Sequence, residues 1–197
     1  MRKLLFLLAL STMGFQSHAQ ESTFNANDLV FNAGIGFGTS LYSGRFYSSV
    51  LPPVSLSGEY GVQEDFIVED LTLGVGGYLG FASSEYRTRF GNNEYGWRYN
   101  YTVIGLRGAL HYPLVDKLDT YGGVMLGYNI FSSKSFGSAP TDFSPASGGL
   151  GLSMYLGGRY YFSDNLAGMA EIGWGVAYLN LGVAFKIGGS GSGSVVN

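Results

Sequence analysis

The chain has 197 residues, of which only 13% are charged, and its formal net charge is −3. Soluble globular chains carry about 25% charged residues, so this composition favours a membrane protein. The absence of cysteine excludes a disulfide framework and thiol chemistry. The mature chain contains no stretch of about 18 apolar residues, which excludes a bundle of transmembrane helices. Since there is no basic stripe either, nucleic acid is not an expected partner.

The first 19 residues have the three parts of a secretory signal peptide. A basic start (MRK) precedes an apolar core over 4–10, and the tripeptide that ends at Ala19 fits a small-x-small cleavage site. The apolar core is too short to span a bilayer. We therefore predict a signal peptide over 1–19, followed by a short N-terminal segment over 20–27.

From residue 28 to Ile187, apolar residues alternate with small or polar ones in eight segments. A period of two is that of a β-strand, and about eight such segments behind an export signal are typical of a small transmembrane β-barrel. In chain order, the apolar faces are Leu29, Phe31, Ala33, Ile35 and Phe37; Val54, Leu56, Tyr60 and Val62; Leu71, Leu73, Val75, Leu79 and Phe81; Ile104, Leu106, Leu110 and Tyr112; Val124, Leu126, Tyr128 and Ile130; Leu150, Leu152, Met154, Leu156, Tyr160 and Phe162; Ala170, Ile172, Trp174 and Val176; and Leu179, Leu181, Val183, Phe185 and Ile187.

The opposite faces of these segments carry mostly Gly, Ser and Ala, with about one charge in some of them. A soluble barrel would keep its apolar face inside and cover its exterior with charge. Small residues instead suit the narrow interior of an eight-stranded barrel. We therefore predict an all-β fold, an eight-stranded antiparallel transmembrane up-and-down β-barrel over 28–187. The inverted, soluble barrel is the alternative.

Aromatic residues on the apolar faces fall into two levels along the strands. Outer-membrane barrels carry a girdle of aromatic rings at each membrane interface, so this sorting supports the outward direction of the apolar faces. One level consists of Phe31, Tyr60, Tyr112, Tyr160, Phe162 and Phe185, and the other of Phe37, Phe81, Tyr128 and Trp174.

The connections between segments alternate in length. Periplasmic turns of such barrels are short and extracellular loops are longer, so both termini are expected on the periplasmic side. Short connections are predicted at Gln63–Asp70, Pro113–Leu118 and Ser163–Asn165, and long ones at Ser40–Pro53, Ala82–Arg98 and Ser132–Ser147. Between Val176 and Leu179 the apolar residues pass from even-numbered to odd-numbered positions. This shift predicts a tight turn at Ala177-Tyr178. The tail over 188–197 has the composition of a flexible Gly/Ser linker.

The residues GLGLSMYLGGRYYFSDNLAGMAEIGWGVAYLNLGVAFKI, which end at Ile187, resemble the closing hairpins of the small outer-membrane β-barrel families, the OmpA/OmpX-like "porin family" barrel domains. At the level of pattern the resemblance extends over nearly all of 28–187. It implies a location in the outer membrane, contact with outer-membrane lipid, and insertion by the outer-membrane assembly machinery, which reads the last strand. Those families tend to end at a terminal aromatic residue, whereas ten residues follow Ile187 here.

Four charged residues fall on the inward faces, toward the predicted periplasmic end: Glu59, Arg107, Arg159 and Glu171. Arg159 and Glu171 are expected to lie diagonally across one hairpin. Two of the four are acidic and two basic, and charges removed from water need partners. We predict a structural salt-bridge layer that closes the lumen. The alternatives are an ion or proton path, or charges that never meet.

Enzymatic activity is not predicted. His111, the one histidine of the mature chain, faces inward at the predicted periplasmic end, where a satisfied polar residue is the expected role. Arginines near Glu59 and Glu171 argue against acid–base catalysis by these carboxylates. No residues have metal-ligand spacing. The glycine runs are not phosphate loops because no helix follows them, so neither a metal nor a cofactor is expected.

The predicted extracellular loops are rich in arginine and aromatic residues, which is typical of recognition surfaces. We expect a structural or surface-recognition role through these loops, toward a protein, a glycan or lipid phosphates. Loops that simply fold on the barrel rim are equally consistent with the composition. The alternatives are an accessory subunit of a larger outer-membrane complex and a narrow channel for small solutes. The recognition candidates are Arg45, Arg87, Arg89, Trp97 and Arg98.

Overall fold

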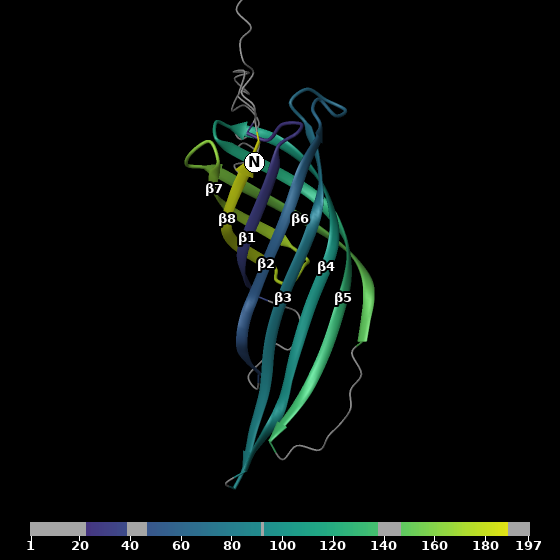
Figure 1. Ribbon diagram of the computed structural model, residues 1–197, viewed down its shortest axis with the longest axis vertical. Helices are drawn as coiled ribbons and strands as arrows, with labels where there is room; N and C mark the ends of the chain where they lie inside the picture. Colours follow the sequence, from purple (N-terminus) through teal and green to yellow (C-terminus); the bar gives the residue numbers. More distant parts are fainter. Residues whose placement is uncertain (1–22, 39–46, 92, 138–146, 189–197) are drawn as a thin grey trace, which may run out of the picture.

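The computed structural model describes residues 23–38, 47–91, 93–137 and 147–188 and shows a β-barrel (Figure 1). The predicted signal peptide, nearly all of the Gly/Ser tail and the candidate Arg45 lie outside the described residues. In the described part of the chain, no helix has the length and apolar character needed to cross a membrane.

Each strand pairs antiparallel with its neighbours in the chain, and the first pairs with the last, so that the sheet closes. The predicted all-β fold, an eight-stranded antiparallel up-and-down barrel, is confirmed. The strands are β1 (Leu29–Phe37), β2 (Tyr47–Gln63), β3 (Thr72–Phe90), β4 (Asn93–Val115), β5 (Leu118–Gly137), β6 (Ser147–Tyr161), β7 (Leu166–Gly173) and β8 (Leu179–Ile187).

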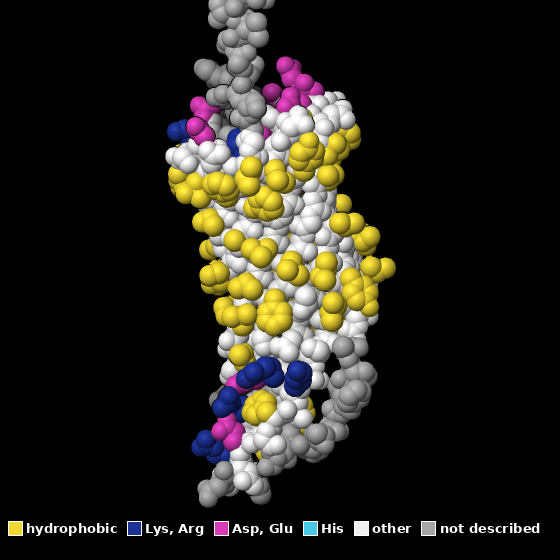
Figure 2. Space-filling view, in the orientation of Figure 1, with side chains coloured by type: hydrophobic (Ala, Val, Ile, Leu, Met, Phe, Trp, Pro, Cys, Tyr) yellow, Lys and Arg dark blue, Asp and Glu magenta, His cyan; other side chains and the backbone are white. Residues whose placement is uncertain are grey.

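The apolar faces of the strands point outward. Leu106 and Leu150 are 71% and 76% exposed, whereas the inward residues Val30 and Ala184 are 0% exposed. On the side shown in Figure 2, the apolar side chains form a band, and charged residues gather beyond it at both ends. Alternation along a pleated strand puts neighbouring side chains on opposite faces of the wall, which is why the sequence pattern determines this arrangement.

The aromatic residues predicted for the two girdles lie on the outer surface. Phe31 on β1 and Phe185 on β8 are direct cross-strand partners at one level, and both are exposed. Tyr128 and Trp174 are exposed at the other level. The Tyr and Trp rings, which have an apolar body and a polar end, suit the boundary between hydrocarbon and water.

The prediction of a long loop over Ala82–Arg98 is wrong. β3 and β4 stay paired up to Phe90↔Asn93, so this segment is a hairpin with a tight turn. The predicted long connections on either side are also partly strand, because β2 begins at Tyr47 and β5 continues to Gly137. Beyond the apolar band a strand needs no apolar face, and the alternation that reveals strands in the sequence disappears there.

The connection between β7 and β8 also differs from the prediction. It spans 174–178 instead of a two-residue turn at Ala177-Tyr178. Val176, expected on the outer face, is 1% exposed and lies inside the barrel with Ala177. Its backbone N–H donates to the Tyr78 hydroxyl at 3.4 Å. The chain leaves the sheet after Gly173 and folds into the mouth of the barrel. The strand rule that side chains at odd and even positions (the two parities) point to opposite faces therefore no longer applies.

The wall of the barrel is unequal in height. β4 has 23 residues, whereas β7 has 8 and β8 has 9, so β3, β4 and β5 project beyond the shorter strands (Figure 1). We call this projecting part, residues 83–91 and 93–98 with 132–137, the tip sheet. The other end, where β4 and β5 join at 116–117, is called the turn end.

Closure of the barrel between β1 and β8 depends on Gly182. A Cβ atom at this position would lie 2.0 Å from the backbone oxygen of Ala33 on β1, and that backbone cannot move without losing the pairing. We predict that Gly182→Val prevents formation of the folded barrel, measured as loss of the heat-dependent gel shift. Gly77→Val is the matched control, since the nearest atom to its Cβ would be the Gly105 oxygen at 3.9 Å. A normal gel shift for Gly182→Val would contradict this role.

Candidate functional site: a buried charge network and a charged tip sheet

A network of charged side chains fills the lumen near the turn end. All its members are buried and project inward from five different strands. They are Glu59 on β2, Arg107 on β4, Asp119 on β5, Arg159 on β6 and Glu171 on β7.

Arg159 lies at the centre of this network, and its side chain is 0% exposed. Its Nη1 donates to Asp119 Oδ2 at 2.8 Å, its Nη2 donates to Glu59 Oε2, and its Nε donates to Asn32 Oδ1 at 3.0 Å. Each nitrogen of the guanidinium thus has a partner, from β5, β2 and β1. A buried charge needs such complete pairing to offset the loss of its hydration.

His111 lies between the same two carboxylates. Its Nδ1 is 2.8 Å from Asp119 Oδ1 and its Nε2 is 3.1 Å from Glu59 Oε1. The imidazolium form, which donates from both nitrogens, satisfies both contacts. Phe24, from the N-terminal segment, stacks on the imidazole with ring centroids 4.0 Å apart and is itself buried. The N-terminal segment therefore covers the network from the turn end.

A second ion pair joins Arg107 to Glu171 across the lumen, with Nη2 and Oε2 2.6 Å apart. The Tyr155 ring centroid lies 3.7 Å from the Arg107 guanidinium carbon. Tyr121 connects the two halves of the network. Its hydroxyl donates to Glu171 Oε2 at 3.2 Å, and its ring centroid lies 4.5 Å from the Arg159 guanidinium carbon.

The structure brings all four predicted lumen residues into ion pairs, with partners on distant strands. Arg159 and Glu171 do lie diagonally in the β6–β7 register, yet Glu171 pairs with Arg107 instead. Sequence reasoning missed Asp119. It shares its parity with the inward-facing Tyr121, but it was assigned no role because it stands directly after a predicted turn.

Above the network, toward the tip sheet, the lumen is filled by packed side chains. Tyr78, Val103, Met125, Tyr155 and Val176 belong to one buried cluster. The contacts of the charged groups are thus with the protein itself, and this arrangement is suited to fixing the strands in place. Over the described residues, no group of three or more His, Asp or Glu side chains could hold a metal ion.

The charged residues of the tip sheet lie on its outer face. The β3–β4 register runs without a shift along both strands, so Glu85 and Arg87 share the parity of the outward-facing Leu79. Arg98 on β4 is the direct partner of Glu85 on one side and of Lys134 on the other. These three charges therefore form a row across the sheet.

Two carboxylates on this face pair with three arginines. Glu85 contacts Arg87 at 2.5 Å and Arg98 at 3.3 Å. Glu94 contacts Arg87 at 2.6 Å and Arg89 at 3.6 Å. The hydrogen bond from the Arg87 guanidinium lowers the pKa of the Glu85 carboxyl, which keeps it charged. With Lys134 added, four cations face two anions, so the outer face of the tip sheet carries an excess of positive charge.

Trp97 lies on the opposite face of the tip sheet, with the parity of the inward-facing Tyr101. Its ring centroid is 6.2 Å from that of Tyr86 and 6.3 Å from that of Tyr95. The candidates predicted for one recognition surface are therefore divided. The arginines at 87, 89 and 98 share the outer face, whereas Trp97 belongs to an aromatic group on the inner face.

No protein-family model matches this chain, and no curated protein matches it. Among solved structures, the attachment invasion locus protein Ail of Yersinia pestis, in complex with the heparin analogue sucrose octasulfate, is similar with a TM-score of 0.51 and 11% sequence identity. The match covers 82% of this chain and 99% of Ail.

The outer membrane protein OprG of Pseudomonas aeruginosa is similar with a TM-score of 0.53 and 11% sequence identity, and the match covers 86% of this chain and 100% of OprG. At such low identity the similarity shows the fold alone. This chain has the fold of the small outer-membrane β-barrels, as its resemblance to the OmpA/OmpX-like barrels predicts.

Removal of Arg159 should destabilise the barrel strongly. Arg159→Met leaves Glu59 and Asp119 buried with His111 as their one remaining shared partner among the described residues, and breaking a buried ion pair costs about 3–5 kcal/mol of unfolding free energy. Urea unfolding of the protein in lipid vesicles measures the loss. Arg89→Met is the matched control, since the Arg89 side chain is 72% exposed and its removal should leave the unfolding midpoint unchanged. Equal midpoints for the two variants would contradict the role of the network.

Proposed function

We propose that this chain is a closed outer-membrane barrel that recognises anionic groups at the cell surface through the outer face of its tip sheet. The observation that carries the proposal is the row Glu85–Arg98–Lys134, in which two cations are direct cross-strand partners. Like charges placed directly opposite each other are destabilising. A bound anion between Arg98 and Lys134 would remove this repulsion.

The proposed orientation places the tip sheet outside the cell and both chain ends in the periplasm. Leu29 at the start of β1 pairs with Ile187 at the end of β8, so both ends of the barrel domain meet at the turn end. β4 and β5 are joined there by two residues, as periplasmic turns usually are. The projecting strands then correspond to the longer extracellular side.

The contents of the lumen favour a recognition role over the narrow channel. Phe24 covers the lumen at the turn end, and Val176 and Ala177 occupy it toward the opposite mouth. Between them lie the ion pairs of Arg107 and Arg159. An eight-stranded barrel is just wide enough for side chains to fill, and a solute would have to displace several of them at once.

The ligand chemistry that fits the tip sheet is a phosphate or sulfate group carried on a glycan. A guanidinium binds such oxyanions with two parallel hydrogen bonds, and an ammonium adds a point charge. Cross-strand Cβ atoms are about 5 Å apart, so one oxyanion can contact Arg98 and Lys134 together. Ail, which shares the fold, was solved with a polysulfated sugar. That is a property of Ail, and it makes polysulfated glycans the first ligands to test.

Replacement of the paired cations should weaken this binding. We predict that Arg98→Gln with Lys134→Gln lowers the affinity for heparin at least about tenfold, because each lost charged hydrogen bond is worth about 1.5–3 kcal/mol. Binding is measured with the folded protein in nanodiscs of neutral lipid, at low and physiological salt, since screening weakens exposed charge pairs. Lys117→Gln, at the turn end, is the matched control and should bind normally.

The same variants in nanodiscs that contain lipopolysaccharide separate the two sources of the anion. If the ligand is the phosphate of the surrounding lipid, lipopolysaccharide will compete with heparin in the natural protein. If it is a soluble glycan, heparin binding will persist. Heparin affinity that is the same in the double variant and in Lys117→Gln would contradict recognition by the tip sheet.

A further inference from the structure

Part of β6 has a neighbouring strand on one side only. Its residues Ser147–Ser153 pair with β5, whereas pairing with β7 stops at Tyr155↔Gly173. The last contact on that side is the Trp174 N–H, which donates to the Met154 oxygen at 3.1 Å. Within the described ranges, no strand pairs with this side of β6 beyond Met154.

The unpaired edge lies at the depth of the apolar band. In an antiparallel strand, alternate residues turn both backbone groups to the same side, so Leu150 and Leu152 turn theirs away from β5, like Met154. Their cross-strand partners are Tyr128 and Leu126, which belong to the outward apolar face. Unpaired backbone at membrane depth is tolerated only where it lines a hydrated cavity or is covered by a partner. Over the part of the chain that the structure describes, the wall of the barrel is therefore open beside β6.

A cavity of about 180 Å³ lies inside this opening. Its lining includes Tyr101, Asn129 and Ser153, together with the connection over 174–178. The Tyr101 hydroxyl donates to Asn129 Oδ1 at 2.7 Å, and the Asn129 amide donates to the Gly149 oxygen at 3.4 Å. No charged side chain lines this cavity among the described residues. It offers neutral hydrogen-bonding groups only.

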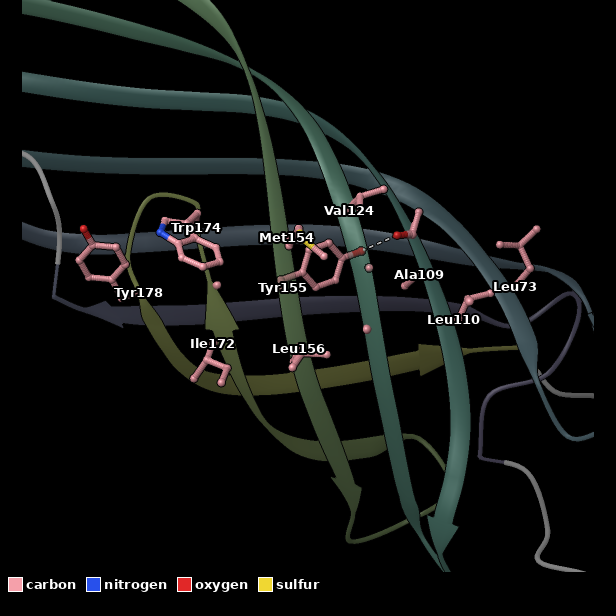
Figure 3. Close-up of a pocket in the computed structure, with 14 residues that line it drawn as sticks. Leu73, Ala109, Leu110, Val124, Met154, Tyr155, Leu156, Ile172, Trp174 and Tyr178 are labelled. Carbon is pink, nitrogen blue, oxygen red and sulfur yellow. Dashed lines mark hydrogen bonds between the residues drawn. The ribbon is translucent and has the colours of Figure 1, made fainter.

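A much larger groove of about 1120 Å³ adjoins this opening at Met154 and Trp174 (Figure 3). It extends from Leu73 on β3 to β7, which is about 19 Å at about 4.8 Å per strand. Gly108 stands at an outward position and leaves room there, since a Cβ atom on it would meet nothing within 4 Å, whereas the Leu156 side chain covers the outward position of Gly122, 2.7 Å from where its Cβ atom would lie. The apolar side chains around them include Leu110, Val124, Met154, Leu156 and Ile172.

Trp174 and Tyr178 line both the groove and the cavity. They stand together at one end of the groove, and Leu73 and Leu110 stand at the other (Figure 3). Both aromatic residues are exposed, at 66% and 43%, and each carries a polar end suited to the membrane interface. The two spaces thus adjoin at the opening in the wall, one of them apolar and the other polar.

We propose that the groove and the cavity together bind one amphiphilic lipid with an uncharged head group. Its acyl chain lies in the groove against Gly108 and the Leu156 side chain, and its hydroxyl or amide head passes beside Trp174 to hydrogen-bond with Asn129 and the free edge of β6. The proposal rests on the membrane location given under Proposed function but not on anion binding by the tip sheet. An added peptide strand could pair with β6, yet it would leave the groove unfilled.

Quenching of Trp174 fluorescence by brominated lipid tests this site directly. The Trp97→Phe background leaves Trp174 as the single tryptophan. The folded protein is placed in phosphatidylcholine bilayers that contain, at equal low mole fraction, a dibrominated monoacylglycerol, dibrominated phosphatidylcholine or dibrominated phosphatidylglycerol. We expect the monoacylglycerol to quench Trp174 several-fold more strongly than either phospholipid.

Filling the groove should abolish this preference. Gly108→Leu places methyl groups where the acyl chain lies and should weaken binding about tenfold, the equivalent of about two buried methylenes. Gly77→Leu is the matched control, since it adds the same side chain at an outward position on β3 that does not line the groove. Asn129→Ala should weaken the preference as well. The gel shift verifies that each variant is folded.

Three results would overturn the amphiphile site: equal quenching by all three lipids, strongest quenching by the anionic lipid, or a preference that survives Gly108→Leu. Absence of quenching by any lipid would instead contradict the membrane location itself. The double variant Arg98→Gln, Lys134→Gln should keep the monoacylglycerol preference, because the tip sheet and this site are independent. A failure of anion recognition is thereby distinguished from a failure of the lipid site.

Discussion

The complete pairing of one buried guanidinium is the constraint on which the rest of this barrel depends. Arg159 projects from β6, and its partners come from β1, β2 and β5, so its bonds are satisfied only when strands on opposite sides of the ring are in place. The neighbouring small residues make room for this. A Cβ atom on Gly157 would lie 2.4 Å from the Tyr121 ring, which lies against Arg159. The glycines of the inward faces thus leave the space that the large polar side chains of the lumen occupy.

Much of the fold could be predicted from the sequence, because alternation depends on a single physical contrast between hydrocarbon outside and small or polar groups inside. That contrast ends where the strands leave the apolar band, so the paired strands within Ala82–Arg98 were expected to be loop. It also ends after Gly173, where the chain folds into the barrel and Val176 becomes buried. Inward positions could be assigned by parity, but the partners could not, since pairing across the lumen depends on the shear of the whole sheet.

Unequal strand length gives the molecule two distinct surfaces at the side away from the turn end. Where β3, β4 and β5 are long, they project as a sheet whose outer face carries the row of Arg98 and Lys134. Where β7 is short, the edge of β6 is left open beside a polar cavity and an apolar groove. The charged residues of the lumen, toward the turn end, stabilise the fold, since they are paired with one another. Recognition and lipid binding are therefore assigned to the wall and the tip sheet, and not to the interior.

The central claim is that the network of Arg159 and Arg107, covered by Phe24, closes the lumen. Planar-bilayer recordings of the folded, purified protein at high salt test it most directly. The account predicts no steady conductance in the natural protein at either polarity. Stable, stepwise conductance from the natural protein, under conditions in which the gel shift shows a folded barrel, would contradict the claim and make the channel the better description.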